Sequence, residues 1–284
     1  MIKLIKKLIV VFFTLIASFL QAQNFQGEAI YQSKRFFEEG SFKVSLGSQD
    51  PALEKRIQES MKKAFEKTYE LHFNTTEALY QEEEKLEAPK NAGSGFMTVV
   101  SVGGEKSYRN IKSKIVIEEE EFFSKEFIVS DTLTAFDWKL SNEQKKIGSY
   151  TCMKATATIA VTAEQLKNYE EQLAKQSKES TQLLTLTAPK VRIIEAWYAP
   201  EIPVNVGPAE YWGLPGLIME VHDDDLVLLC TKVTLNPKER KKIEQPKKGK
   251  KVTKAAYDKI VEEKLESMKD GDGSIRIESI QIGG

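Results

Sequence analysis

The chain has 284 residues, of which 41% are hydrophobic and 29% are charged, and its 41 basic and 42 acidic side chains give a formal net charge of −1. These values are ordinary for a globular protein, and the length is sufficient for one large core or two small ones. The balanced charge excludes the overall basic surface of a nucleic-acid-binding protein. The sequence shows no internal repeat and no sign of a second domain, so one domain is expected over residues 23–284.

Residues 1–22 predict a secretory signal peptide. Three lysines precede an uncharged apolar stretch over residues 8–20, and small or permissive residues lead up to Ala22. The apolar stretch is short for a membrane span, which needs about 20 residues, so an uncleaved anchor is the less favoured alternative. We therefore expect an exported chain that begins at Gln23 and resides in the periplasm, at the outer membrane or outside the cell, with no transmembrane span in the mature chain.

Alternation of apolar and polar residues, which is typical of strands, recurs through most of the chain. It predicts strands over residues 27–37, 69–74, 77–82, 137–140, 150–161, 190–198, 217–221, 226–235 and 274–282, with several more inside the β-rich stretch 107–131. Residues 96–100 are either a short strand or a mobile segment. The run 150–161 is long and rich in β-branched residues, which favours a central position in a sheet.

Helical insertions are expected near residues 51–67, 163–178 and 238–270. Asp50 followed by Pro51 is a typical helix start, and Thr162 predicts the N-cap of the second helix. The third region opens with a basic tract, residues 238–254, that holds nine Lys or Arg residues against two Glu. This tract is interpreted either as a solvated loop or as a surface for anionic lipid headgroups.

Strands therefore dominate, and consecutive strands are joined by short turns or by helical insertions. This pattern predicts an α+β, mostly β fold: a single curved antiparallel sheet or half-barrel with helical insertions packed at one side. Such an arrangement is similar to the lipoprotein-carrier fold of the bacterial envelope. That similarity is an analogy of fold and carries no function with it.

The stretch 200–215 combines prolines and glycines with apolar and aromatic residues, so we expect an irregular loop that lies on one face of the sheet. Gly213 and Gly216 are expected to take backbone conformations that a Cβ disfavours. Leu214 and Leu217 are expected to be buried, which would make the loop a plug over the sheet. The alternative is that the loop projects outward as a recognition patch.

Residues 213–218 spell Gly-Leu-Pro-Gly-Leu-Ile, and this string resembles the signature of the GLPGLI family, a group of exported proteins of Bacteroidetes-type bacteria. The resemblance extends to residues 196–203 and 147–155, and it covers most of the mature chain. It implies an exported protein, and the family has no established activity that could be transferred. The motif residues of this chain are Gly213, Leu214, Pro215, Gly216, Leu217 and Ile218.

The two cysteines, Cys152 and Cys230, both lie in strand-like runs. In an oxidising exported compartment, we expect them on neighbouring strands and bridged by a disulfide. The alternative is a pair of separate buried thiols, which behave as small hydrophobic side chains.

Motifs for catalysis, for cofactor binding and for metal binding are missing from the sequence, so no catalytic residue, no cofactor and no metal site is predicted. His222 precedes three aspartates and is the best metal candidate, but a tight turn cannot aim all four side chains at one ion. The acidic run 118–121 would point to both faces of a strand, so a solvated turn or sheet edge is favoured there.

The leading interpretation is an exported, non-enzymatic protein of the cell envelope that binds a hydrophobic or peptide ligand, or an outer-membrane protein partner, on one face of the curved sheet. The residues expected to line that face are Trp197, Tyr198, Tyr211, Trp212, Leu214 and Leu217. One alternative is an envelope hydrolase that uses acidic residues. Another is a structural or assembly protein that is recognised through its 213–218 loop.

Overall fold

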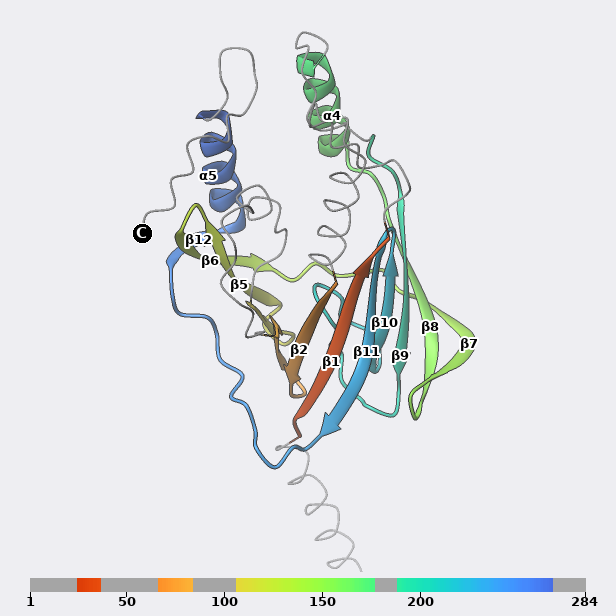
Figure 1. The fold of residues 1–284 in the computed structure, drawn as a ribbon. Coiled ribbons are helices and arrows are strands. Elements are labelled where there is room, and N and C mark those ends of the chain that lie inside the picture. Colours follow the sequence, from red (N-terminus) through yellow and green to blue (C-terminus); the bar gives the residue numbers. More distant parts are fainter. Residues whose placement is uncertain (1–24, 37–65, 84–105, 177–187, 268–284) are drawn as a thin grey trace, which may run out of the picture.

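The computed structural model describes residues 25–36, 66–83, 106–176 and 188–267. These residues form twelve strands in one open, curved sheet together with two helices (Figure 1). The predicted α+β, mostly β fold with a curved sheet is therefore confirmed. Neither helix in these ranges is long and apolar enough to cross a lipid bilayer.

Short turns connect most of the strands in chain order. The strands are β1 (Gly27–Arg35), β2 (Lys67–Phe73), β3 (Glu77–Glu82), β4 (Lys106–Asn110), β5 (Ile115–Phe122), β6 (Lys125–Thr132), β7 (Lys139–Ile147), β8 (Tyr150–Ile159), β9 (Arg192–Ala199), β10 (Leu217–Asp223), β11 (Leu226–Leu235) and β12 (Lys250–Thr253). The helices are α4 (Ala163–Gln176) and α5 (Lys254–Ser267). Thr162 caps α4 as predicted, because its Oγ1 accepts a hydrogen bond from the backbone N of Gln165 (3.1 Å).

Across the sheet the strands lie in the order β12-β6-β5-β4-β3-β2-β1-β11-β10-β9-β8-β7. Neighbouring strands are antiparallel, except that β12 pairs with β6 in parallel. Strand β1 joins two runs of consecutive strands, since it pairs with β2 on one side and with β11 on the other. We call β2 to β6 with β12 the first half of the sheet, β7 to β11 the second half, and the face that carries Tyr31 of β1 the inner face.

The loop between β9 and β10, residues 200–216, packs against the sheet as predicted. Its buried apolar side chains belong to the two apolar clusters of the core and are Ile202, Val204, Val206, Tyr211 and Leu214. Its backbone also bonds to β10, because the Ile218 N donates to the Val206 O (3.1 Å). Leu214 and Leu217 are both 0% exposed, so the expectation that they are buried is confirmed.

The two glycines of the 213–218 motif are required for different reasons. Gly213 has a φ of +95°, a conformation that L side chains rarely adopt, which confirms the expectation for this position. Gly216 is not in the left-handed region. A Cβ at Gly216 would instead lie 2.4 Å from the Ala199 O, so the absence of a side chain permits a close approach of two backbone segments.

One prediction of local structure is too short and another is wrong. The strand predicted to open over 137–140 is β7, but β7 spans Lys139–Ile147 at the edge of the sheet and is longer than expected. Most of its residues are exposed and polar, so they lack the apolar alternation by which strands are recognised. The acidic run 118–121 forms neither a solvated turn nor an edge, because it lies in β5 between β4 and β6.

The basic tract, interpreted from the sequence as a solvated loop or a lipid-binding surface, is an extended connection that ends in the short strand β12. Residues 236–249 run from the end of β11 to the start of β12 (Figure 1). On the way, the Lys241 Nζ pairs with the Glu70 Oε2 of β2 (2.6 Å), and Pro246 is buried. Helix α5 (Lys254–Ser267) follows and lies within the helical insertion predicted near 238–270. The lysines of the tract are exposed to solvent, while its backbone connects the end of β11 to β12 at the edge of the first half.

The prediction that Cys152 and Cys230 lie on neighbouring strands is wrong. Cys152 lies on β8 and Cys230 on β11, and β9 and β10 separate these strands. Both thiols are free and buried, so the predicted disulfide is also wrong and the alternative of two buried thiols applies. The consecutive hairpins from β8 to β11 place the two runs three strands apart, a distance in the sheet that strand-like sequence cannot reveal.

Several predicted elements lie outside the described residues. They are the signal peptide over 1–22, most of the helix over 51–67, the segment 96–100 and the last strand over 274–282.

Candidate functional site

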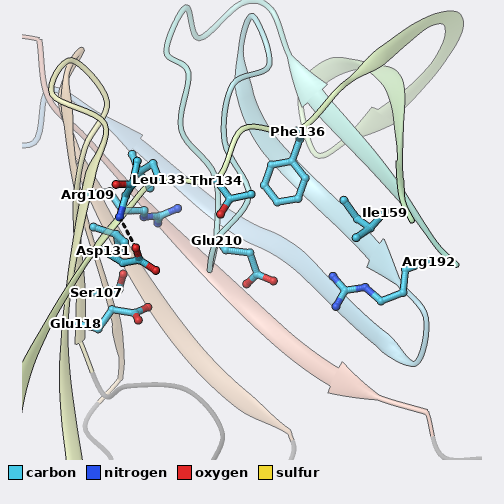
Figure 2. Close-up of a pocket in the computed structure, with 12 residues that line it drawn as sticks. Ser107, Arg109, Glu118, Asp131, Leu133, Thr134, Phe136, Ile159, Arg192 and Glu210 are labelled. Atoms are coloured by element: carbon cyan, nitrogen blue, oxygen red, sulfur yellow. Dashed lines mark hydrogen bonds between the residues drawn. The ribbon is translucent and has the colours of Figure 1, made fainter. Parts of the chain in front are cut away.

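A pocket with a volume of about 300 Å³ lies between the two halves of the sheet. Its lining residues are Ser107, Arg109, Val116, Glu118, Asp131, Thr132, Leu133, Thr134, Phe136, Ile159, Arg192 and Glu210. In Figure 2, Arg109, Ser107, Glu118 and Asp131 form one wall, Glu210 lies in the middle, and Phe136, Ile159 and Arg192 lie on the opposite side. The pocket therefore combines five charged side chains with an apolar wall.

The first wall follows from strand register. Ser107 of β4 pairs with Glu118 of β5, and Val116 of β5 pairs with Arg109 of β4 and with Asp131 of β6. Directly paired residues project from the same face of a sheet, so these side chains all meet on the inner face. At the equivalent positions of β1 and β2 the inner face is apolar. The change from apolar to charged residues across β4 to β6 creates the pocket.

Arg109 lies at the floor of the pocket and is 1% exposed. Its Nη2 donates a hydrogen bond to the Gly207 O of the loop (2.9 Å), and its guanidinium carbon lies 5.9 Å from the centre of the Tyr80 ring. Its Nε and Nη1 have no hydrogen-bond partner among the described residues. Buried N–H groups of a charged side chain are normally bonded, because leaving them unpaired costs free energy. The floor of the pocket thus presents unfilled donors.

The charge of Arg109 persists at neutral pH. Burial lowers the pKa of its guanidinium to about 10, while the nearby Glu210 and Glu118 act in the opposite direction. A pKa of about 10 leaves the side chain protonated under physiological conditions. The floor of the pocket therefore carries a positive charge.

Three carboxylates lie above Arg109 at increasing exposure. Glu118 is partly buried, and this burial raises its pKa, although the positive charge of Arg109 opposes the shift. Asp131 and Glu210 are exposed. The Asp131 Oδ1 accepts a hydrogen bond from the Thr132 N (2.7 Å), whereas the Glu210 carboxylate makes no hydrogen bond or ion pair with a described residue. The mouth of the pocket is therefore acidic.

The opposite wall comes from the ends of β8 and β9, which contribute Ile159 and Arg192. The Arg192 Nη2 pairs with the Asp223 Oδ2 (2.7 Å), and the same oxygen accepts a hydrogen bond from the Tyr211 hydroxyl (2.8 Å). Burial raises the pKa of Tyr211, so its hydroxyl remains protonated and serves as a donor. Arg192 is thus engaged by an internal carboxylate, unlike Arg109.

Two tryptophans connect the segment between β6 and β7 to the loop. The Trp212 Nε1 donates to the Thr134 O (2.7 Å), and the Trp138 Nε1 donates to the Trp212 O (2.8 Å). The rings of Phe136 and Tyr211 lie 5.7 Å apart at their centres. These contacts fix Thr134 and Phe136 at the rim of the pocket.

The structure does not gather the six predicted ligand residues on one open face. Trp197 and Leu217 belong to one apolar cluster of the core, and Tyr198, Tyr211 and Leu214 belong to the other. These five are at most 7% exposed, which argues for a role in the core. Trp212 is the sixth, and it reaches the rim of the pocket through Thr134.

Sequence reasoning missed the five charged residues of the pocket: Arg109, Glu118, Asp131, Arg192 and Glu210. One signal was available for β4, where Ser107 and Arg109 alternate with Tyr108 at strand period and so place polar groups on a single face. Glu210 had no such signal, because it lies in an irregular loop.

A metal site has no support in the described part of the chain. No group of three or more His, Cys, Asp or Glu side chains is arranged there to hold an ion. His222 contacts Glu220 of the same strand (Nε2 to Oε1, 2.5 Å), while Asp224 and Asp225 form the turn between β10 and β11.

Comparison with known proteins shows similarity to a family and to solved structures, but it assigns no activity to this chain. Residues 138–220, which run from the segment before β7 into β10, match the model of a family described as "Protein of unknown function (Porph_ging)". No curated protein matches the chain. Two crystal forms of PNGF-II are similar in structure, with 15% sequence identity and TM-scores of 0.46 and 0.47. The alignments cover 83% and 84% of this chain but 33% and 32% of those chains, so this chain spans about a third of their length.

Proposed function

We propose that this chain is an exported, non-enzymatic protein of the cell envelope, related to the GLPGLI family, that binds a small ligand in the pocket above Arg109. The match over residues 138–220 is consistent with that family, since it includes the 213–218 string. The predicted signal peptide over 1–22 supports export.

The state of Arg109 is the observation that carries the proposal. A guanidinium that is 1% exposed keeps Nε and Nη1 without a partner in the described chain, directly beneath a pocket of ligand size. A ligand oxygen would accept a hydrogen bond from one of these donors, and the apolar side chains of Phe136, Ile159 and Leu133 would contact the apolar part of the ligand. Both the hydrophobic and the peptide ligands expected from the sequence have this combination of groups.

Native mass spectrometry of protein purified from the envelope tests the proposal. We expect a small molecule to remain bound to the parent protein and to be lost from Arg109→Lys, which retains the charge but removes the planar donors. Arg35→Lys is the matched control, because Arg35 lies on the same sheet and pairs with Asp225 outside the pocket (3.0 Å). A parent protein that carries no small molecule, or an Arg109→Lys protein that carries the same one, would contradict the proposal.

A second candidate is an envelope hydrolase, and the three carboxylates of the pocket favour it. General acid catalysis requires one carboxyl group with a raised pKa beside another that stays ionised. Burial raises the pKa of Glu118, and the exposed carboxylate of Asp131 lines the same pocket. Turnover of envelope peptides or saccharides that disappears in Glu118→Gln and persists in Glu119→Gln would establish this function in place of simple binding.

A further inference from the structure

The charges of the pocket are arranged by depth, and this arrangement restricts the ligand. The cation at the floor is Arg109, Glu118 is partly buried above it, and Asp131 and Glu210 are exposed at the mouth. Building on the proposed binding function, we infer that the ligand is a small zwitterion of the amino-acid or dipeptide class, with its carboxylate on Arg109 and its ammonium group between Glu210 and Asp131.

The floor selects a carboxylate. The Nε of Arg109 carries one hydrogen and Nη1 carries two, and none of them is bonded to a described residue. Guanidinium groups form short, charge-assisted hydrogen bonds with carboxylate oxygens, and these are stronger than bonds to neutral acceptors. The remaining nitrogen, Nη2, is held by the Gly207 O, so the side chain is already fixed for the ligand.

The mouth requires a positive group on the same ligand. Three carboxylates line the pocket against two arginines, and Arg192 is already paired with Asp223. A ligand with negative charge alone would therefore approach Arg109 against a repulsive field. An ammonium group at the mouth reverses this effect, because the Glu210 carboxylate has no partner in the described chain.

The apolar lining and the volume of the pocket limit the size and the apolar part of the ligand. Phe136 and Ile159 offer an apolar surface opposite the charged wall (Figure 2). A volume of about 300 Å³ is at the small end of ligand pockets, and it fits one or two residues better than a lipid or a long peptide. A dipeptide with one apolar side chain would place its carboxylate at the floor, its ammonium group at the mouth and its side chain against the apolar residues.

Isothermal titration with three probes tests the inference: the dipeptide Ala-Phe, its N-acetyl derivative, which lacks the ammonium group, and its C-terminal amide, which lacks the carboxylate. We expect Ala-Phe to bind to the parent protein at least about 10-fold more tightly than either derivative, because each derivative lacks one charge-assisted hydrogen bond. Glu210→Gln should lower the affinity for Ala-Phe by about the same factor and leave the affinity for the N-acetyl derivative unchanged. Glu239→Gln, at an exposed site outside the pocket, is the control.

The outcomes separate this inference from the function on which it rests. Equal affinity for all three probes, or no effect of Glu210→Gln on Ala-Phe, would overturn the zwitterion while leaving a binding function intact. If none of the probes binds, the inference is also overturned, and the native mass spectrum then decides whether any ligand is bound. Glu210 is exposed, so its variant is expected to fold even if Arg109→Lys does not.

Discussion

The inner face of the sheet differs in polarity between the two halves. In the second half the inner face is apolar, and the loop over residues 200–216 buries it with Leu214 and Tyr211 at no more than 1% exposure. In the first half, β4 to β6 place Ser107, Arg109 and Glu118 on the equivalent face, and the chain leaves a pocket above them. The apolar, motif-bearing part therefore supplies stability, whereas the polar part with unfilled donors is where the proposed ligand would bind.

The halves are joined where the loop meets the pocket. The Gly207 O accepts from Arg109 of the first half, and the Trp212 Nε1 donates to the Thr134 O at the end of β6. Variants on either side of this junction should therefore separate loss of stability from loss of binding.

The largest effect is expected for Gly216→Val. A Cβ there would lie 2.4 Å from the Ala199 O, a backbone atom at the end of β9 that cannot move without disturbing the pairing of Ala199 with Leu217 of β10. We expect the free energy of unfolding to fall by about 4 kcal/mol or more, measured by urea denaturation. Gly148→Ala is the control: its φ is +58° but nothing lies within 4 Å, so about 1 kcal/mol is expected. Similar losses for the two variants would contradict the close approach.

Leu214→Ala should be the next most damaging change. The side chain is 0% exposed within an apolar cluster, so its truncation should cost about 3 kcal/mol through lost contacts and a cavity. Leu140→Ala, at 59% exposure on the edge strand, should change stability by less than about 0.5 kcal/mol. Unchanged stability of Leu214→Ala with lost partners in a pull-down would make the loop a recognition patch instead.

Alkaline pH should lower the free energy of unfolding through the two buried thiols of the second half. Burial raises the pKa of Cys152 to about 11 and that of Cys230 to about 12 in the folded protein, from an ordinary value of 9.0. The unfolded chain loses these protons first as the pH rises, so their contribution to stability is complete below pH 9 and is lost above it. We expect a loss of roughly 2 kcal/mol between pH 8 and pH 10. The double variant Cys152→Ala, Cys230→Ala should flatten this slope, and an unchanged slope would exclude the thiols as its cause.

The smallest effect on stability, and the most selective for binding, is expected for Trp212→Phe. It removes the hydrogen bond to the Thr134 O at the rim of the pocket, which should cost about 1 kcal/mol and weaken ligand binding several-fold. Trp197→Phe is matched to it, because its Nε1 bonds to Glu195 outside the pocket (2.9 Å). Calorimetry should find reduced affinity for the first variant alone. Equal affinities would mean that the rim does not position the ligand.

The apolar half was the more predictable from sequence. Alternating residues gave the strands β8 to β11 nearly to their ends, and the apolar composition of residues 200–215 was enough to place the loop on the sheet. These features are local or follow from burial alone. The full length of the edge strand β7 was not predicted, because its exposed residues show no apolar alternation.

The pocket was not predictable, because it depends on register between strands that are distant in the chain. Arg109 and Glu118 become neighbours through the pairing of β4 with β5, and Glu210 approaches them only through the fold of the loop. A single sequence reveals neither the pairing nor the unfilled donors. The same limit explains the error over Cys152 and Cys230, whose strands are separated by β9 and β10.

The most direct measurement is the Nε–H resonance of Arg109 in ¹⁵N-labelled protein, identified by its absence from Arg109→Lys. In the ligand-free protein this hydrogen has no bonding partner among the described residues. If the pocket binds a carboxylate, titration with Ala-Phe should shift the resonance downfield and protect it from exchange with water, while the Nε–H of Arg35 stays unchanged. An Arg109 resonance that is unaltered at saturating dipeptide would contradict binding at this site.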